Sequence, residues 1–183
     1  MHYFGESFIV LTGGPGAGKT TLLDALSQAG FATAGEVGRA VIKDQMRVMG
    51  RALPWIDPPL YAEVMMSWEM RSYRLHAAQG GLRFFDRGIP DVIGYLRLCG
   101  LPVPEHMHRA TEAFRYGNRV FLLPPWPEIF KQDHERKQTI EEARRTYEAM
   151  AETYAELGYE LVEVPRLSVG ERMEFVVEAA SGR

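Results

Sequence analysis

Residues Gly13-Gly14-Pro15-Gly16-Ala17-Gly18-Lys19-Thr20 fit the pattern G-x-x-x-x-G-K-[ST] at every fixed position. The glycines allow successive backbone N–H groups to point at an anion. Lys19 can reach the outer phosphates of a nucleotide, and the Thr20 hydroxyl can bind Mg²⁺. We also expect the next residue, Thr21, to belong to the nucleotide-binding site. This segment predicts that the chain binds a nucleoside triphosphate.

The residues on either side of this loop support the same interpretation. The apolar run 8–12 before it is typical of a buried strand, and Leu22, Leu23, Leu26 and Ala29 after it mark one face of a helix. The alternative is a glycine-rich turn that only connects a strand to a helix. We favour phosphate binding, because the free N–H groups and the dipole at a helix N-terminus both attract an anion.

Apolar runs of strand length alternate with amphipathic helical patterns along the rest of the chain. The expected strands are 8–12, 31–33, 82–85, 120–123 and 161–164. This alternation predicts an α/β fold of the three-layer P-loop NTPase type. It would have a parallel sheet of about five strands, helices on both faces and a short lid. Ligands of such sheets bind beyond the carboxyl ends of the strands.

Three helix starts can be located from their capping residues. Asp57 precedes Pro58-Pro59 and is the expected N-cap of a long amphipathic helix. The segments 139–142 and 168–171 carry the capping-box pattern, in which a Ser or Thr is followed three residues later by Glu. Each of these two starts is followed by an apolar stripe at helical spacing.

Length and charge limit the classes of function. The chain has 183 residues, of which 46% are hydrophobic, so we expect a single domain over 1–183 with a lid at about 124–138. The net charge is −3 and the pI is near 6.0, and no block of basic residues occurs. A surface that follows nucleic-acid phosphates needs clustered Lys and Arg, so no nucleic-acid partner is expected.

The only cysteine, Cys99, cannot form an internal disulfide, and we expect it to be a buried small side chain rather than a reactive thiol. No signal-peptide pattern and no apolar run of 18 residues occurs. These features predict a cytoplasmic protein without a membrane span.

Charged residues follow two of the expected strands. Glu36 and Arg39 come after the second one, where they can bind a substrate hydroxyl and an anion, or simply form an exposed i,i+3 ion pair. Asp86 and Arg87 come after 82–85. A carboxylate at Asp86 can hold Mg²⁺ opposite Thr20, and Arg87 can pair with a substrate phosphate or carboxylate. The alternative for Asp86 is a helix N-cap.

The segment after the fourth expected strand has the features of a charged lid. Pro124-Pro125-Trp126-Pro127 leads into the mixed-charge run 130–137. Phosphoryl transfer needs cations around the transferred group, so an arginine on a closing segment suits this chemistry. Arg136 is the first candidate and Lys131 the second. The alternative is an ordinary solvated surface segment.

Together these residues resemble the P-loop kinase-like branch of nucleotide-binding proteins, and within it the small bacterial predicted ATPases of the AAA-domain group. The resemblance rests on the phosphate loop, on Glu36 with Arg39, on Asp86-Arg87-Gly88, and on the segment 124–136. Nucleoside, thymidylate and ribosylnicotinamide kinases carry a similar Asp-Arg pair. By that resemblance Asp86 corresponds to a magnesium or base carboxylate, and Arg87 to a substrate clamp.

Several features distinguish this chain from other P-loop classes. No guanine-reading Asn-Lys-x-Asp or Thr-Lys-x-Asp motif occurs, and the D-x-x-G pattern at 91–94 falls in an expected helix, which argues against a regulatory GTPase. A mechanical AAA+ ATPase would need Asp-Glu at a strand end, whereas Asp86 is followed by Arg. The five histidines have no zinc spacing, so the expected metal is Mg²⁺.

Two hypotheses of function follow, both with ATP and Mg²⁺ as cofactors. In the first, the protein is a kinase that phosphorylates a small nucleoside- or nucleotide-like acceptor. Lys19 binds the phosphates, Arg136 closes over them, Glu36 or Asp86 orients the acceptor and Arg87 holds it. In the second, the protein is a slow ATPase or nucleotide-dependent binding module that is read by a protein partner. The stripe Tyr61, Val64, Met65 and Trp68 can line the acceptor pocket or belong to the core, and Arg166 can flank the base or lie on the surface.

Overall fold

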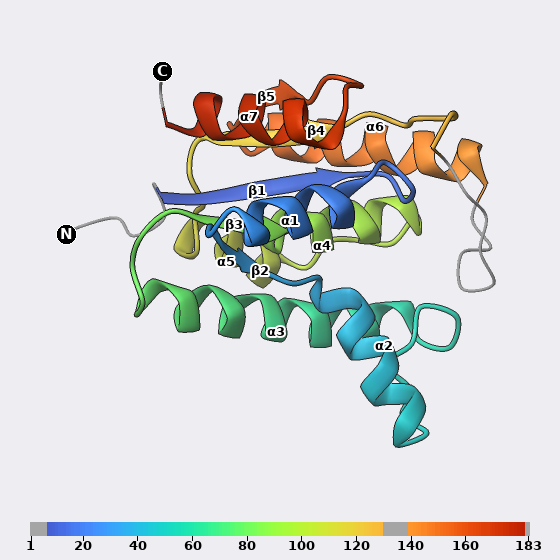
Figure 1. Ribbon diagram of the computed structural model, residues 1–183. Helices are drawn as coiled ribbons and strands as arrows, with labels where there is room; N and C mark the ends of the chain where they lie inside the picture. The colour runs from blue at the N-terminus through green and yellow to red at the C-terminus, as the bar shows by residue number, and fades with distance from the viewer. Residues whose placement is uncertain (1–6, 130–138, 182–183) are drawn as a thin grey trace.

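The computed structural model describes residues 7–129 and 139–181. A five-stranded parallel sheet, in the order β2-β3-β1-β4-β5, forms its centre (Figure 1). Its strands are β1 (Phe8–Gly13), β2 (Ala32–Ala34), β3 (Arg83–Asp86), β4 (Arg119–Leu123) and β5 (Glu160–Glu163). All five predicted strands are found, each within one residue of the predicted ends.

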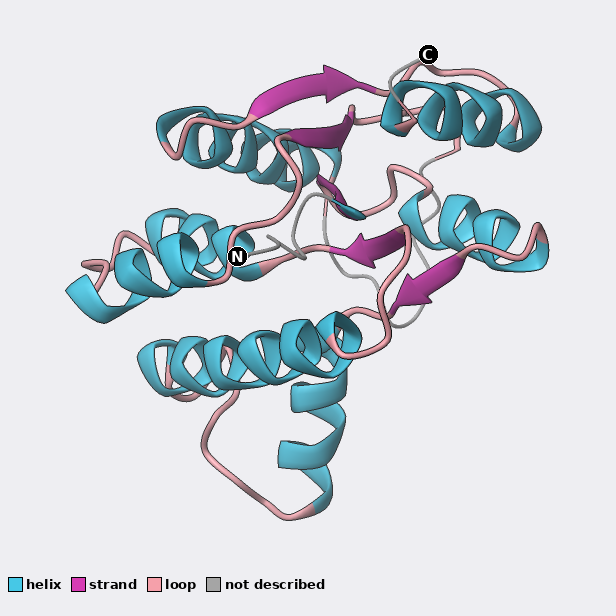
Figure 2. Ribbon diagram, turned by 90° about the vertical axis from the view of Figure 1, so that its left-hand side faces the viewer, coloured by secondary structure: helices cyan, strands magenta, loops and turns pink. Residues whose placement is uncertain are grey.

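Helices cover both faces of the sheet, as Figure 2 shows. They are α1 (Lys19–Gln28), α2 (Val37–Arg47), α3 (Pro58–Ala77), α4 (Ile89–Leu98), α5 (Glu105–Ala113), α6 (Ile140–Glu156) and α7 (Val169–Ala180). The side chains of the buried strand β1 alternate between the two faces of the sheet, so they contribute to a core on each face. Phe8 and Val10 pack into one core with α3, α4 and α6, whereas Ile9 and Leu11 pack into a second core with α1 and α7. The predicted three-layer α/β fold is confirmed.

The predicted helix starts are also confirmed. The Asp57 carboxylate accepts a hydrogen bond from the Leu60 backbone N–H at 3.2 Å and so caps α3. Thr139 and Glu142 exchange the two hydrogen bonds of a capping box at the start of α6. A second capping box begins α7.

Close backbone packing holds the loop after β1 in place. A Cβ atom on Gly13, whose φ is 132°, would lie 2.4 Å from the Leu123 carbonyl oxygen. A Cβ atom on Gly14 would lie 2.2 Å from the Ala143 carbonyl oxygen. The loop therefore passes between β4 and α6 in a space that admits only glycine.

One prediction about the core is wrong. Cys99 is exposed, not buried. It is the C-cap residue of α4, whose inward face is made by Val92, Ile93 and Leu96. The helix ends at this point, where Gly100 has φ at 65°, and the thiol lies outside the core. No helix of the described residues is both long enough and apolar enough to cross a bilayer.

Candidate active site

The phosphate loop joins β1 to α1, and Lys19 is the first residue of that helix. The Lys19 side chain is buried, and its ammonium donates hydrogen bonds to the carbonyl oxygens of Gly13 at 3.1 Å and Gly14 at 2.9 Å. Burial lowers the pKa of Lys19 to about 7 and Arg87 acts in the same direction, while the Asp86 carboxylate opposes them. The buried Lys19 ammonium is therefore poorly solvated, and an anionic ligand bound beside it would favour its charged form.

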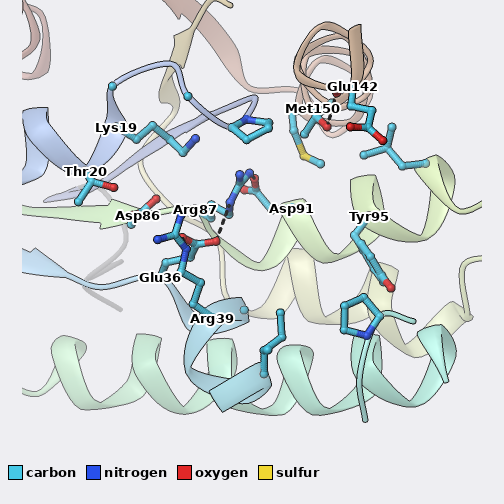
Figure 3. A pocket seen from close by; sticks show the side chains of 18 of the residues that line it. Lys19, Thr20, Glu36, Arg39, Asp86, Arg87, Asp91, Tyr95, Glu142 and Met150 are labelled. Carbon is cyan, nitrogen blue, oxygen red and sulfur yellow. Dashed lines mark hydrogen bonds and ion pairs between the residues drawn. The ribbon is translucent and has the colours of Figure 1, made fainter. Parts of the chain in front are cut away.

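Asp86 ends β3, beside Leu11 of β1. It is buried, and its Oδ1 atom has no hydrogen-bond partner among the described residues. Burial raises the pKa of Asp86, against the effect of Lys19. Figure 3 shows the oxygen atoms of Asp86 and Thr20 facing the same space. A free buried carboxylate oxygen and a hydroxyl are oxygen ligands suited to Mg²⁺, so the residues present fit this ion.

Asp91 organises the residues that follow β3. Its Oδ1 accepts hydrogen bonds from the Thr12 hydroxyl at 2.5 Å and from Arg87 Nη1 at 3.0 Å. Its Oδ2 accepts hydrogen bonds from the Gly88 N–H at 3.0 Å and the Tyr154 hydroxyl at 2.6 Å. Both carboxylate oxygens are thus fully used, and the Arg87 guanidinium is fixed in orientation.

The alternative role of Asp86 as a helix N-cap is wrong, because Gly88 is the N-cap residue of α4. Sequence reasoning did not identify Asp91, which it noted only as part of D-x-x-G. Two signals were present: Asp91 follows Arg87 at i,i+4 spacing, and it is the third residue of the helix.

Glu36 occupies the N-cap position of α2, where it meets two arginines. Its carboxylate lies 3.2 Å from Arg39 Nε and 3.6 Å from Arg87 Nε. The two interpretations of Glu36 and Arg39 are therefore compatible, because the i,i+3 ion pair forms and both residues also line the same cleft as Lys19. Figure 3 shows Glu36 between the two arginines.

Arg172 of α7 is a second residue that sequence reasoning missed. It is buried against the phosphate loop, where Nη2 donates to the Ala17 carbonyl oxygen at 3.0 Å. Its guanidinium lies 5.5 Å from the centre of the Trp126 ring, and its Nε has no partner among the described residues. Burial lowers the pKa of Arg172. Arg166, which was considered as a neighbour of the base, is exposed.

Comparison with known proteins agrees with this geometry. The model of a family described as an AAA domain matches residues 8–172. This chain belongs to that AAA domain family. No curated protein matches the sequence. Among solved structures, the chain is similar to thymidylate kinase from Ehrlichia chaffeensis, with a TM-score of 0.63 and 14% identity over 97% of this chain and 99% of that one. The molecule is a nucleotide-binding protein with a P-loop kinase-like fold.

The cleft of this AAA domain protein has a volume of about 1330 Å³ and continues well beyond the phosphate loop. Pockets for single small molecules usually measure ~300–1,000 Å³, so this cleft is larger than one such ligand needs. Its far part is lined by α3, α4 and α6. Of the stripe considered for the acceptor pocket, Tyr61 and Met65 line this part, whereas Val64 packs against the core and Trp68 is exposed. Trp126 of the expected lid lines the cleft near the loop. Arg136 and Lys131 lie outside the described residues.

Proposed function

We propose that the protein transfers the terminal phosphoryl group of ATP to a small nucleoside- or nucleotide-like acceptor, with Mg²⁺ as the required ion. The supporting observation is the continuous cleft, which runs from the phosphate loop at one end to a second compartment between α3, α4 and α6 at the other. A protein that only hydrolyses ATP needs no such compartment, since water is its acceptor.

The donor half of the cleft is formed by the loop glycines, Lys19, Thr20, Thr21 and Asp86. In this proposal the Lys19 ammonium exchanges its two carbonyl partners for phosphate oxygens, which are stronger acceptors for a charged donor. Thr20 and Asp86 hold Mg²⁺. When bound, this ion neutralises charge on the phosphates.

Glu36, Arg87 and Arg39 form the acceptor half. Arg87 keeps its charge, because Asp91 and Glu36 raise the pKa of its guanidinium, and it can hold an anionic or hydroxyl group of the acceptor. The acceptor oxygen attacks the γ-phosphorus as the bond to the ADP oxygen breaks. The acceptor proton passes to the Glu36 carboxylate, which lies in the cleft next to that arginine.

The first test measures nucleotide binding. At an ATP concentration near 100 Kd, binding should stabilise the protein by ~2.7 kcal/mol, which corresponds to a rise in Tm of roughly 5–10 °C. Lys19→Ala removes the buried cation and should abolish this rise, as measured by differential scanning fluorimetry. Glu63→Gln, which changes a residue paired with His106 at the surface, is the matched control variant and should keep the rise. An unchanged Tm rise in the variant would contradict the site assignment.

The second test measures turnover. ADP formation should increase when one member of a panel of nucleosides, nucleotides and ribosylated vitamins is added, and a phosphorylated product should appear. If every acceptor leaves the basal rate unchanged, the phosphotransferase proposal fails.

One surface feature favours the other candidate, a nucleotide-dependent binding module. The segment between α2 and α3 exposes large apolar side chains, among them Met49 at 92% exposed, Val48 at 66% and Trp55 at 62%. Exposed apolar groups that cluster in this way are typical of protein contact sites. A partner protein that raises the basal ATPase rate, in the absence of any small acceptor, would support this candidate.

A further inference from the structure

A buried carboxyl group in the far part of the cleft has no role in the proposed chemistry. Glu69 lies in the middle of α3, is only 5% exposed, and lines the cleft. Within residues 7–129 and 139–181, no hydrogen bond or ion pair joins its carboxyl group to another side chain or to the backbone. The carboxyl oxygens still reach the cleft, so this largely buried group without a protein partner is free to bind a ligand there.

The position of Glu69 along α3 directs it toward the acceptor compartment. Tyr61, Met65 and Glu69 follow one another at i, i+4 and i+8, so they share one face of the helix. Tyr61 meets Tyr95 of α4 edge to face, with ring centres 5.3 Å apart. The thioether of Met150 on α6 also lines the cleft. Glu69 thus places a carboxyl group on a wall of aromatic and thioether side chains, where the hydroxyls of Tyr61 and Tyr95 are the neighbouring polar groups.

Burial and the neighbouring charges determine whether the Glu69 carboxyl group is protonated or ionised. Burial raises the pKa of Glu69 well above its usual range, and the carboxylates of Asp91, Asp86 and Glu36 raise it further. Arg87 opposes them but is already bound by Asp91 and Glu36. A protonated carboxyl group has an O–H to donate and cannot act as a general base.

We propose that Glu69 is a specificity residue of the acceptor site, where its O–H donates a hydrogen bond to a carbonyl oxygen or ring nitrogen of an uncharged, flat acceptor. This inference rests on the proposed phosphotransferase function and adds the chemical class of the acceptor. The ring lies against the aromatic and thioether wall. Its hydroxyl-bearing part extends toward Glu36 and Arg87.

The experiment compares Glu69→Gln with Glu69→Met. The glutamine amide keeps an N–H donor in nearly the same shape, whereas methionine fills the space without a donor. Thymidine, uridine and adenosine serve as uncharged flat probes, and nicotinamide riboside as a cationic one. Glu63→Gln on the same helix is the control, because Glu63 is partly exposed and pairs with His106 at the surface.

For the uncharged probe that supports turnover, Glu69→Met should raise KM by about ten- to a hundredfold, because it leaves a buried acceptor unpaired. Glu69→Gln should stay within about threefold of the wild type. Both variants should keep the ATP-dependent rise in Tm, which shows that they fold. An unchanged KM in Glu69→Met would overturn the proposal. If both variants raise KM equally, and only for the cationic probe, Glu69 acts as a carboxylate. That result would also overturn the proposal.

Equilibrium binding of the same probes with a non-hydrolysable ATP analogue separates the two proposals. If thymidine binds and Glu69→Met weakens it, while no product forms, the assignment of Glu69 holds and phosphotransfer fails. If turnover occurs and Glu69→Met leaves both binding and KM unchanged, only the assignment of Glu69 fails. If no probe binds and none is turned over, both are wrong.

Discussion

At the scale of single residues, the orientation of Arg87 depends on Asp91. Asp91→Asn removes the charge that holds Arg87 and leaves a partly buried guanidinium with only the weaker contact to Glu36. Removing one partner of a fully buried ion pair costs about 3–5 kcal/mol. Because Arg87 is partly exposed, we expect a loss of at most that size in the free energy of unfolding, measured by urea denaturation, together with a higher KM for the acceptor.

Tyr154→Phe provides the comparison for Asp91→Asn. It deletes one hydrogen bond to Asp91 but keeps the charge pair with Arg87, so it should cost only about 1.5–3 kcal/mol. Equal stability of Asp91→Asn and the wild type would show that this network does not fix Arg87.

Local sequence patterns located the cleft residues whose position depends on near neighbours. Lys19 and Thr20 follow from the loop spacing, and Asp86 follows from its place at a strand end. Arg172 could not be found in this way, since it is 155 residues from the carbonyl oxygen that it contacts. Glu69 was missed for a different reason: its helical stripe was recognised by apolar residues, and a carboxyl group does not fit that pattern.

At the scale of elements, α6 offers a test of which arginine assists phosphoryl transfer. Arg145 lines the cleft one turn after the capping box, whereas its neighbour Arg144 pairs with Glu141 at the surface. If Arg145 contacts a phosphate, Arg145→Ala should lower kcat/KM for ATP by about ten- to a hundredfold, the effect of a lost charge-assisted hydrogen bond. Arg144→Ala is the control and should change little.

Arg136→Ala completes this comparison, because it tests the arginine expected to close over the phosphates. It should leave the ATP-dependent rise in Tm intact and reduce kcat. If Arg136→Ala lowers kcat while Arg145→Ala has normal kinetics, the arginine that assists phosphoryl transfer is Arg136, in the segment that follows Trp126. Normal kinetics in both variants would contradict an arginine on this side of the cleft.

Element existence was predictable because hydrophobic periodicity is a local property, and the ends of helices carry capping side chains. Burial at the ends of elements was less predictable. Cys99 follows an apolar helix, yet it is exposed because Gly100, with φ at 65°, turns the chain at that point. The direction of a chain after a helix depends on tertiary packing, which the pattern of residues in the helix does not contain.

At the scale of the whole molecule, the parallel sheet gathers the ends of β1 and β3 at one edge, so the phosphate loop, Asp86 and Arg87 could be placed together from the sequence. The shape of the acceptor compartment could not. It depends on how α3, α4 and α6 pack against each other. For example, Met150 of α6 packs over Gly94 of α4. Side-chain volumes across three helices decide this packing, and their sequence spacing gives no direct measure of it.

The stability of the molecule should depend on pH through Glu69. In the unfolded chain this carboxyl group ionises above its ordinary pKa of about 4.5, whereas burial raises its pKa and so favours the protonated form in the folded protein. The unfolded state then binds fewer protons, so this group reduces stability as pH rises from about 4.5 toward the folded pKa. The ionisable groups around it are Asp91, Asp86, Glu36, Arg87 and Tyr116.

Glu69→Gln cannot ionise in either state, so it should raise Tm by several degrees at pH 7.5 and leave it nearly unchanged at pH 4. Differential scanning calorimetry of both proteins across this range measures the difference. Glu63→Gln is again the control, since an exposed residue on the same helix should show no comparable trend. A Glu69→Gln variant that is less stable than the wild type at pH 7.5 would mean that the carboxyl group is ionised and paired in the folded protein, and the donor role assigned to it in acceptor binding would fall with that result.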